Sequence, residues 1–396
     1  MTGRASEWRA RVFLVLASLA LTLFAAEGAA RFLLRPARLR LAEGTPISEL
    51  SPSLGWRARP SGSQHLRRED FDVTISINAK GLRGPDLPYQ AVPPRRRLAI
   101  MGDSYASGYY AEEAETLAAR LGQALQSCQV DVLNAGQPGY STDQEWLFFN
   151  EEIRKYDPRE VLLLFFYNDL SFNIEPASSN RAKPLFIERG GSLELILPAM
   201  SFPDGGEVLR DGEPPPMFHR SALWRFAADR LLRVSPGGSR ALARYGLVPE
   251  ISTVPPREFL PFGPMETGEK AGVEEMWNRT ATILRGFRDE VRVRGAGFSV
   301  FYVPSRMEVN DDAWNFVLRR FEPARPWRRD AVRTRLAQLL ATLDIPLVEA
   351  NRAFATAEKS HRLAYLPVDG HWNARGNEIA FESVLPLMRR AFDCAP

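Results

Sequence analysis

The sequence predicts an α/β fold: a three-layer α/β/α sandwich around a parallel sheet, preceded by one helix that crosses a membrane. Two observations lead to this prediction. From position 95 onward, short apolar segments alternate with segments whose apolar residues recur at helical spacing, which is typical of parallel strands joined by helical crossovers. Near the N-terminus, residues 12–26 contain no charged residue. The length of 396 residues allows one large domain with additions, or two domains.

The composition excludes several classes of protein. Apolar residues make up 45% and charged residues 25%, which excludes a disordered chain, a collagen-like fibre and a membrane protein with many spans. The net charge is +3 and no basic stripe is interleaved with aromatic residues, so we expect no nucleic-acid partner. Cys128 and Cys394 lack metal-ligand spacing, and we expect no metal site. They are either buried free thiols or, in an exported body, a disulfide.

An apolar segment at residues 12–34 predicts a transmembrane signal anchor behind an N-terminal tail at 1–11. As one helix it would be roughly 34 Å long, enough for a hydrocarbon core of about 30 Å. A cleaved signal peptide is disfavoured because apolar residues continue past the Ala-rich stretch. A buried core helix is disfavoured because apolar residues lie on every side of the helix. Arginines lie on both sides, so charge does not decide the orientation. We take the body to be exported, periplasmic or extracellular.

The rest of the chain divides into three parts. Residues 35–94 are rich in Pro, Arg and Ser and predict a linker and small extension, with one strand at 71–77. Residues 95–396 form the main domain. Between about 171 and 270 Pro- and Gly-rich sequence interrupts the alternation, which predicts an insertion with one helix at 223–234, packed on the domain or against a membrane or acyl chain. Strands are expected at 98–101, 130–133, 161–167, 298–303 and 345–348, and helices at 115–127, 142–155, 273–293, 330–343 and 374–392.

Residues suited to acyl transfer follow four of the five expected strands. Ser104 follows the first strand, Gly139 the second, Asn168 the third, and Asp369 and His371 the fifth. Ligands bind at the carboxyl ends of the strands in open α/β sheets, so we expect these residues to meet. A serine hydroxyl needs a neighbouring base, and a histidine oriented by a carboxylate is the natural one. The backbone N–H groups of Ser104 and Gly139 and the side-chain amide of Asn168 would stabilise an oxyanion.

In four sequence blocks the chain resembles the SGNH (GDSL) hydrolases. The blocks are GDSYASG at 102–108, NAGQPGYST at 134–142, YND at 167–169 and DGHWNARGN at 369–377. The resemblance covers about 95–392, apart from the insertion. It implies a flavodoxin-like five-stranded parallel sheet and no metal or organic cofactor.

The same resemblance implies a role for each candidate residue. Ser104 would be the nucleophile, and Asp369 and His371 would complete the catalytic triad. The oxyanion hole would be formed by Ser104, Gly139 and Asn168.

Two features depart from the family pattern. One residue, Gly370, separates Asp369 from His371 where two are usual, which puts their hydrogen bond in question. Tyr167 precedes Asn168 where glycine is frequent, so a larger side chain would lie beside the oxyanion site.

Each candidate residue also has an ordinary structural interpretation. Ser104 would be a helix N-cap, Asn168 and Asp169 turn residues at a strand end, and Gly139 a turn glycine. We favour the catalytic interpretation because four blocks occur in the right order. The other histidines, His65, His219 and His361, are assigned surface or packing roles.

The sequence therefore predicts a membrane-anchored serine esterase that works through an acyl-enzyme. The expected substrate is an ester-bearing small molecule or glycan, such as O-acyl groups on an envelope polymer. An O-acyltransferase with the same site, and a module that binds glycan or acyl groups without catalysis, are the alternatives. The sequence does not indicate the acyl group, the alcohol or the oligomeric state.

Overall fold

The computed structural model describes residues 2–33, 41–68, 70–178, 181–189, 192–197, 221, 265, 271–320, 327–360, 362–367 and 369–394. The helix expected at 223–234, together with His219 and His361, lies outside these residues. The chain divides into two units. The first contains the N-terminal helix, and the second carries the main sheet.

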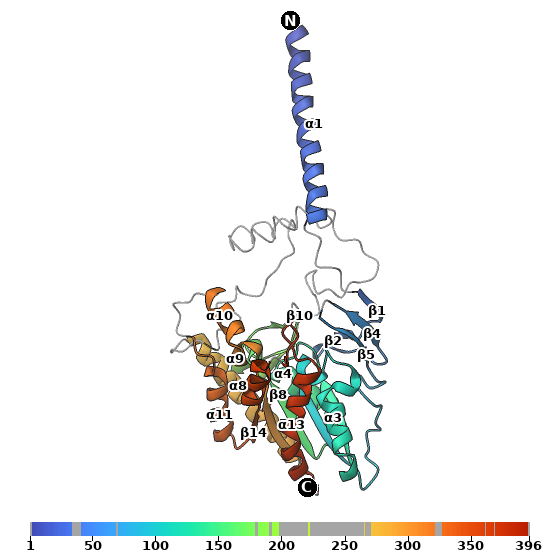
Figure 1. Cartoon of the computed structure of the whole chain (residues 1–396), viewed down its shortest axis with the longest axis vertical. Helices are drawn as coiled ribbons and strands as arrows, with labels where there is room; N and C mark the ends of the chain where they lie inside the picture. The colour runs from blue at the N-terminus through green and yellow to red at the C-terminus, as the bar shows by residue number, and fades with distance from the viewer. Residues whose placement is uncertain are drawn as a thin grey trace. The chain divides into compact units, whose positions relative to one another are not determined.

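The N-terminal unit contains one long helix, α1 (Thr2–Leu33), shown in Figure 1. Within it, Ala10–Ala29 is long and apolar enough to cross a membrane, and none of this stretch is buried. A core helix would bury one apolar face, so that alternative is disfavoured. The helix suits either a membrane span or a signal sequence, and it begins ten residues before the apolar segment.

Five parallel strands form the central sheet of the second unit. In space they follow the order β14-β13-β8-β6-β7. This is the flavodoxin-like order that the family resemblance implied. The order reverses between β6 and β8, and ligands bind outside the carboxyl ends of strands at such a point. The strands are β6 (Arg96–Gly102), β7 (Val130–Gly136), β8 (Glu160–Phe165), β13 (Gly297–Tyr302) and β14 (Leu347–Glu349).

Helices cover both faces of this sheet, which confirms the predicted α/β/α sandwich (Figure 1). Along β6, Ala99 and Met101 pack into one apolar layer, while Leu98 and Ile100 pack into the other. Burial on both faces explains why the strands read as continuous apolar segments. One layer contains α4 (Thr142–Glu151), α8 (Ala271–Val293) and α11 (Ala331–Thr342); the other contains α3 (Leu117–Ala124), α12 (Asn351–Lys359) and α13 (Ala374–Ala391).

Two expected helices are shorter than their apolar period suggested. α3 and α4 end early and are followed by the 3-10 turns η2 (Gln126–Cys128) and η3 (Ile153–Tyr156). Gln129 and Asp157 then adopt left-handed conformations, which turn the chain into the next strand. Among the described residues, the sequence missed five helices and the turn η1 (Glu113–Glu115). The missed helices are α2 (Ser104–Ser107), α5 (Asn168–Phe172), α9 (Arg306–Val309), α10 (Asp311–Arg320) and α12 (Asn351–Lys359).

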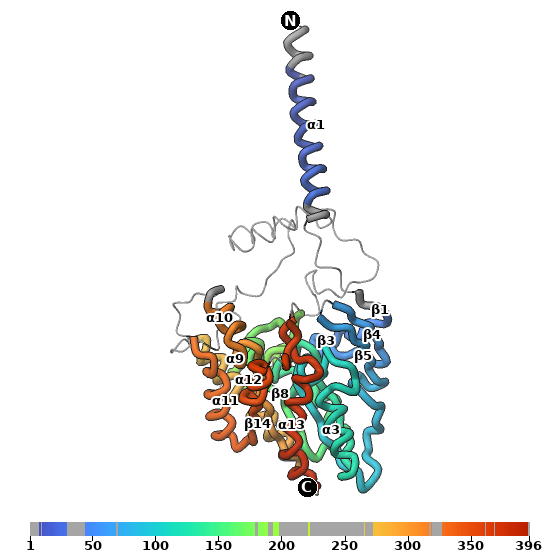
Figure 2. The backbone as a smooth tube through the Cα atoms, viewed as in Figure 1, coloured from blue at the N-terminus to red at the C-terminus, as the bar shows by residue number. Residues whose placement is uncertain are grey.

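Residues 41–94, which we call the N-terminal extension, contain five strands where the sequence predicted one. An antiparallel sheet has the order β1-β4-β5, and β2 and β3 form a hairpin. Figure 2 traces β3, β4 and β5 in blue in the same unit as the red C-terminal segment. The strands are β1 (Leu41–Thr45), β2 (Ser48–Ser51), β3 (Gly55–Ala58), β4 (Ser63–Arg67) and β5 (Asp72–Ser76).

The described part of the expected insertion contains two short hairpins. They pair β9 (Ala177–Ser178) with β10 (Arg181–Ala182), and β11 (Leu185–Arg189) with β12 (Ser192–Ile196). Phe186 on β11 stacks on Trp146 of α4, with ring centroids 5.1 Å apart. The second hairpin is therefore packed on the helical layer.

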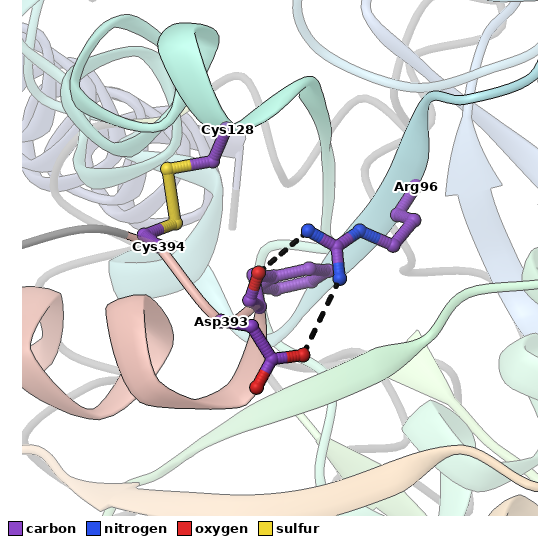
Figure 3. The surroundings of a disulfide bond; sticks show 5 residues. Arg96, Cys128, Asp393 and Cys394 are labelled. Carbon is purple, nitrogen blue, oxygen red and sulfur yellow. Dashed lines mark hydrogen bonds and ion pairs between the residues drawn. A yellow bond between two sulfur atoms is a disulfide. The ribbon is translucent and has the colours of Figure 1, made fainter.

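A disulfide joins Cys128 to Cys394, so the free-thiol alternative is wrong (Figure 3). The two Cα atoms are 5.5 Å apart, although 266 positions separate the residues in sequence. Beside it, Arg96 donates to the Phe392 carbonyl and lies 3.7 Å from the Asp393 carboxylate. The end of the chain is thus fastened to the start of the sheet.

Gly136 at the end of β7 permits a close approach by the short helix α2 (Ser104–Ser107). A Cβ atom at Gly136 would lie 2.1 Å from the Ser107 nitrogen and 2.5 Å from the Ala106 carbonyl carbon. We therefore expect Gly136→Ala to displace α2 and to lower the free energy of unfolding by about 1–3 kcal/mol.

Gly122→Ala on α3 is the matched control, because its Cβ would only touch Val132 at 3.9 Å. That variant should be neutral or gain up to about 1 kcal/mol from helix propensity. Urea unfolding of both variants measures the difference. Equal stability of the two would contradict the proposed packing.

Candidate active site

Ser104 begins α2 directly after the first strand of the sheet. The cap of this helix is Asp103, whose carboxylate accepts a hydrogen bond from the Tyr105 N–H at 2.9 Å. The interpretation of Ser104 as the N-cap is therefore wrong. The Ser104 N–H lies in the first turn, where amides have no intrahelical acceptor. Burial raises the pKa of Asp103 to about 6, against the opposing effect of the Tyr105 hydrogen bond.

Three of the predicted site residues form one continuous chain of hydrogen bonds. Ser104 Oγ lies 2.9 Å from His371 Nε2. On the other side of the ring, His371 Nδ1 bonds Asp369 Oδ1. The fold brings serine and histidine together across 267 positions of sequence. With its proton on Nδ1, the imidazole can accept the serine proton at Nε2.

The one-residue spacing between Asp369 and His371 does not prevent their hydrogen bond. Gly370 adopts the left-handed conformation, with φ +86°. Two backbone bonds close the turn, from Gly370 N to Leu366 O at 3.0 Å and from Leu366 N to His371 O at 2.7 Å. This tight turn lets the side chains on either side of the glycine meet.

Asp369 is held in its ionised form. Its side chain is 11% exposed, and Oδ2 lies 3.3 Å from Arg68 Nη1. Burial raises the pKa of Asp369, but the hydrogen bond and charge of His371, the charge of Arg68 and a hydrogen bond with Tyr110 outweigh it. The pKa therefore lies below its usual value. The carboxylate can orient the imidazole and stabilise its protonated form.

Aromatic side chains hold the His371 ring in place. Tyr105 stacks on it with centroids 4.8 Å apart, and Tyr110 lies at 4.3 Å. Tyr105 is itself packed against Phe166 at 4.8 Å and Trp372 at 4.9 Å. These contacts restrict the ring's rotation away from Ser104.

The two remaining predicted residues lie in the segments that follow β7 and β8. Gly139, with φ +83°, follows β7, and Asn168 is the first residue of α5 (Asn168–Phe172), just beyond β8. Because β6 lies between β7 and β8, its carboxyl end lies between the starts of these two segments. The Asp169 carboxylate accepts from the Phe166 N–H at 2.8 Å and holds the turn before Asn168.

Sequence reasoning missed a buried arginine that contacts α2 and the residues after it. Arg83 is 3% exposed, and its guanidinium donates to the carbonyls of Ser107 at 3.1 Å, Gly108 at 2.6 Å and Ala111 at 2.7 Å. Its Nε lies 2.9 Å from the Glu113 carboxylate. These bonds satisfy the carbonyls at and beyond the end of α2. The sequence indicated only a linker and small extension in this region.

The hairpin β2–β3 supports the loop that contains Gly139. The Trp56 indole donates to the Pro138 carbonyl at 3.0 Å, and the Ala58 N–H donates to the Gln137 side chain at 2.8 Å. Nothing in the sequence pattern links these distant segments.

An open cleft of about 740 Å³ lies beside His371, within the size range of small-molecule sites. Tyr167, which departs from the family pattern, contributes to its wall. Apolar and polar groups are mixed along the cleft; they include Phe166, Met307, Phe316, Arg306, Asn310 and Asp312.

Titratable side chains elsewhere do not indicate a metal site. Within the described part of the chain, no three His, Cys, Asp or Glu side chains are grouped as a metal ion would require. His65 pairs with Asp72 on the exposed face of the extension, consistent with its surface role.

No family model and no curated protein matches the sequence. Among solved structures, the chain is similar to a GDSL-like lipase from Bacteroides thetaiotaomicron, with 12% identity, 76% of this chain and 92% of that chain covered, and a TM-score of 0.36. It is also similar to a lipase/acylhydrolase from Enterococcus faecalis, with 13% identity and a TM-score of 0.37. That match covers 74% of this chain and 96% of the other. A third similar structure is an acetyl xylan esterase from Geobacillus stearothermophilus, with 13% identity and a TM-score of 0.37. That match covers 77% of this chain and 97% of the other. At such low similarity, function is inferred from this chain's own side chains.

Proposed function

We propose that the protein is a serine esterase of the SGNH type. The observation that carries the proposal is the hydrogen-bond chain from Ser104 through His371 to Asp369. It lies at the carboxyl edge of the sheet, where the strand order reverses. A nucleophile bonded to a base, with the base oriented by a carboxylate, is the arrangement that acyl transfer requires.

The reaction proceeds in two balanced steps. Ser104 Oγ attacks the ester carbonyl carbon, its proton passes to His371 Nε2, and the carbonyl π electrons move to oxygen. The tetrahedral intermediate collapses, the bond to the alcohol oxygen breaks, and His371 returns the proton to the leaving alcohol. Water then attacks the acyl-enzyme with the same proton transfers and releases the acid and free Ser104.

Three donors are proposed for the oxyanion: the N–H groups of Ser104 and Gly139 and the side-chain amide of Asn168. This proposal is supported by the position of all three residues, which follow the ends of adjacent strands. Each such donor contributes about 2.7–4 kcal/mol of transition-state stabilisation. The proposed site therefore combines a nucleophile, a base and charge stabilisation.

The cleft suits an ester whose alcohol is a sugar unit. It is open, combines aromatic with polar groups and is lined by His371, whose Nε2 lies 2.9 Å from Ser104 Oγ. We therefore expect an acylated chain to lie across it with one ester beside Ser104. We therefore propose O-acyl groups on an envelope glycan as the substrate class. Transfer to a glycan hydroxyl would use the same residues, and comparing free acid with acylated glycan in one reaction distinguishes the two outcomes.

Substitution of the hydrogen-bonded residues tests the mechanism. With a short-chain aryl ester and full-length protein in detergent, Ser104→Ala and His371→Ala should each lower kcat by about 10⁴-fold or more, because each removes part of one catalytic unit. Asp369→Asn should also lower kcat strongly, because the imidazole loses the partner that fixes its tautomer.

Ser63→Ala and His65→Ala are the matched controls, since both residues are on the extension and bond Ser76 and Asp72 instead. Hydrolysis that survives Ser104→Ala would overturn the mechanism. A wild type that binds acylated glycan without hydrolysing or transferring the acyl group would favour a binding module.

We further propose that the body is exported and anchored through α1. The Cys128–Cys394 disulfide supports this orientation, because such bonds persist in oxidising compartments. A reporter enzyme that is active only outside the cytoplasm, fused after Pro396, should be active. The same reporter fused to a chain lacking residues 10–29 should be inactive. Activity of the second fusion, or inactivity of the first, would contradict the proposal.

A further inference from the structure

We infer that Arg68 and Asp70, in the turn between β4 and β5, position the Asp369–His371 pair. The inference rests on the proposed function of Ser104 and His371. Neither residue belongs to the sequence blocks of the site, and both come from the N-terminal extension.

Asp369 is held by its side chain and by its backbone. His371 bonds one carboxylate oxygen, Oδ1, while Arg68 Nη1 lies 3.3 Å from the other, Oδ2. The Asp369 N–H donates to Asp70 Oδ2 at 2.9 Å. Rotation of the carboxylate or displacement of the backbone would break one of these contacts. Together they orient the oxygen that the imidazole uses.

The turn that carries Arg68 is itself well supported. The Arg68 N–H donates to the Phe71 carbonyl at 2.8 Å, a backbone bond that closes the turn between β4 and β5. The Arg68 guanidinium lies over the Phe71 ring, 5.5 Å from its centroid. Phe71 in turn contacts Tyr110 edge-to-face at 5.0 Å, and Tyr110 packs on the His371 ring.

An apolar contact joins this turn to the segment before Asp369. Leu366, three residues upstream of Asp369, packs in the same cluster as Leu66 and Val73. The extension and the segment that leads to Asp369 therefore form one packed group.

The expected effect on catalysis exceeds the expected effect on stability. The Arg68 side chain is 33% exposed, and an ion pair of this exposure contributes about 0–1 kcal/mol to folding. By contrast, a displacement of about 1 Å in a catalytic group can cost about 100-fold in rate. A positioning role thus predicts a lower kcat with little change in stability.

The test measures aryl-ester hydrolysis by full-length protein in detergent. We expect Arg68→Gln to lower kcat on the order of 10-fold while leaving KM and the unfolding midpoint nearly unchanged. Arg68→Lys should recover most of kcat, because it keeps a cation beside Oδ2. Asp70→Ala should also lower kcat, as Arg68→Gln does. Arg67→Gln is the matched control: it is adjacent, 68% exposed and paired with Asp72.

A double-mutant cycle separates positioning from a general structural effect. If Arg68 acts through Asp369, Arg68→Gln should have almost no effect in the Asp369→Asn background. An undiminished effect there, or equal kcat for Arg68→Gln and Arg67→Gln, would overturn the positioning role. Ser104→Ala is measured alongside, because hydrolysis that survives it would instead overturn the proposed function.

Discussion

The site depends on the position of β6 between β7 and β8 in a parallel sheet. Parallel pairing places the carboxyl ends of these strands at one edge, so the loops that carry Ser104, Gly139 and Asn168 start side by side. Gly136 then allows α2 to pack directly on the end of β7. His371 reaches this edge from the turn before α13 and completes the arrangement by bonding Ser104.

The N-terminal extension supports this edge at three points. Trp56 bonds the loop that contains Gly139, Arg83 bonds the end of α2, and Arg68 pairs with Asp369. Each contact joins segments that are distant in sequence, and each uses a polar group that is at least partly buried. The extension is therefore a framework for the site as well as a connection toward the N-terminal helix.

Much of the fold and the site was predictable, for identifiable physical reasons. A strand buried on both faces must be almost continuously apolar, so the segment at 161–167 was visible in the sequence. The extension strands are short, polar on one face and paired with each other, so four of five were missed. Arg83 was missed because arginine is usually exposed, and its burial depends on carbonyls supplied by tertiary structure. The Asp369–His371 bond depends on the left-handed turn at Gly370, which the spacing alone did not reveal.

We propose above all that His371, oriented by Asp369, activates Ser104 as the nucleophile. Reaction of full-length protein with a fluorophosphonate, followed by peptide mass spectrometry, tests it without knowledge of the natural substrate. We expect one phosphonyl group, on Ser104, and we expect it to form much more slowly in His371→Ala. Phosphonylation of a different residue, or an equal rate in His371→Ala, would contradict it.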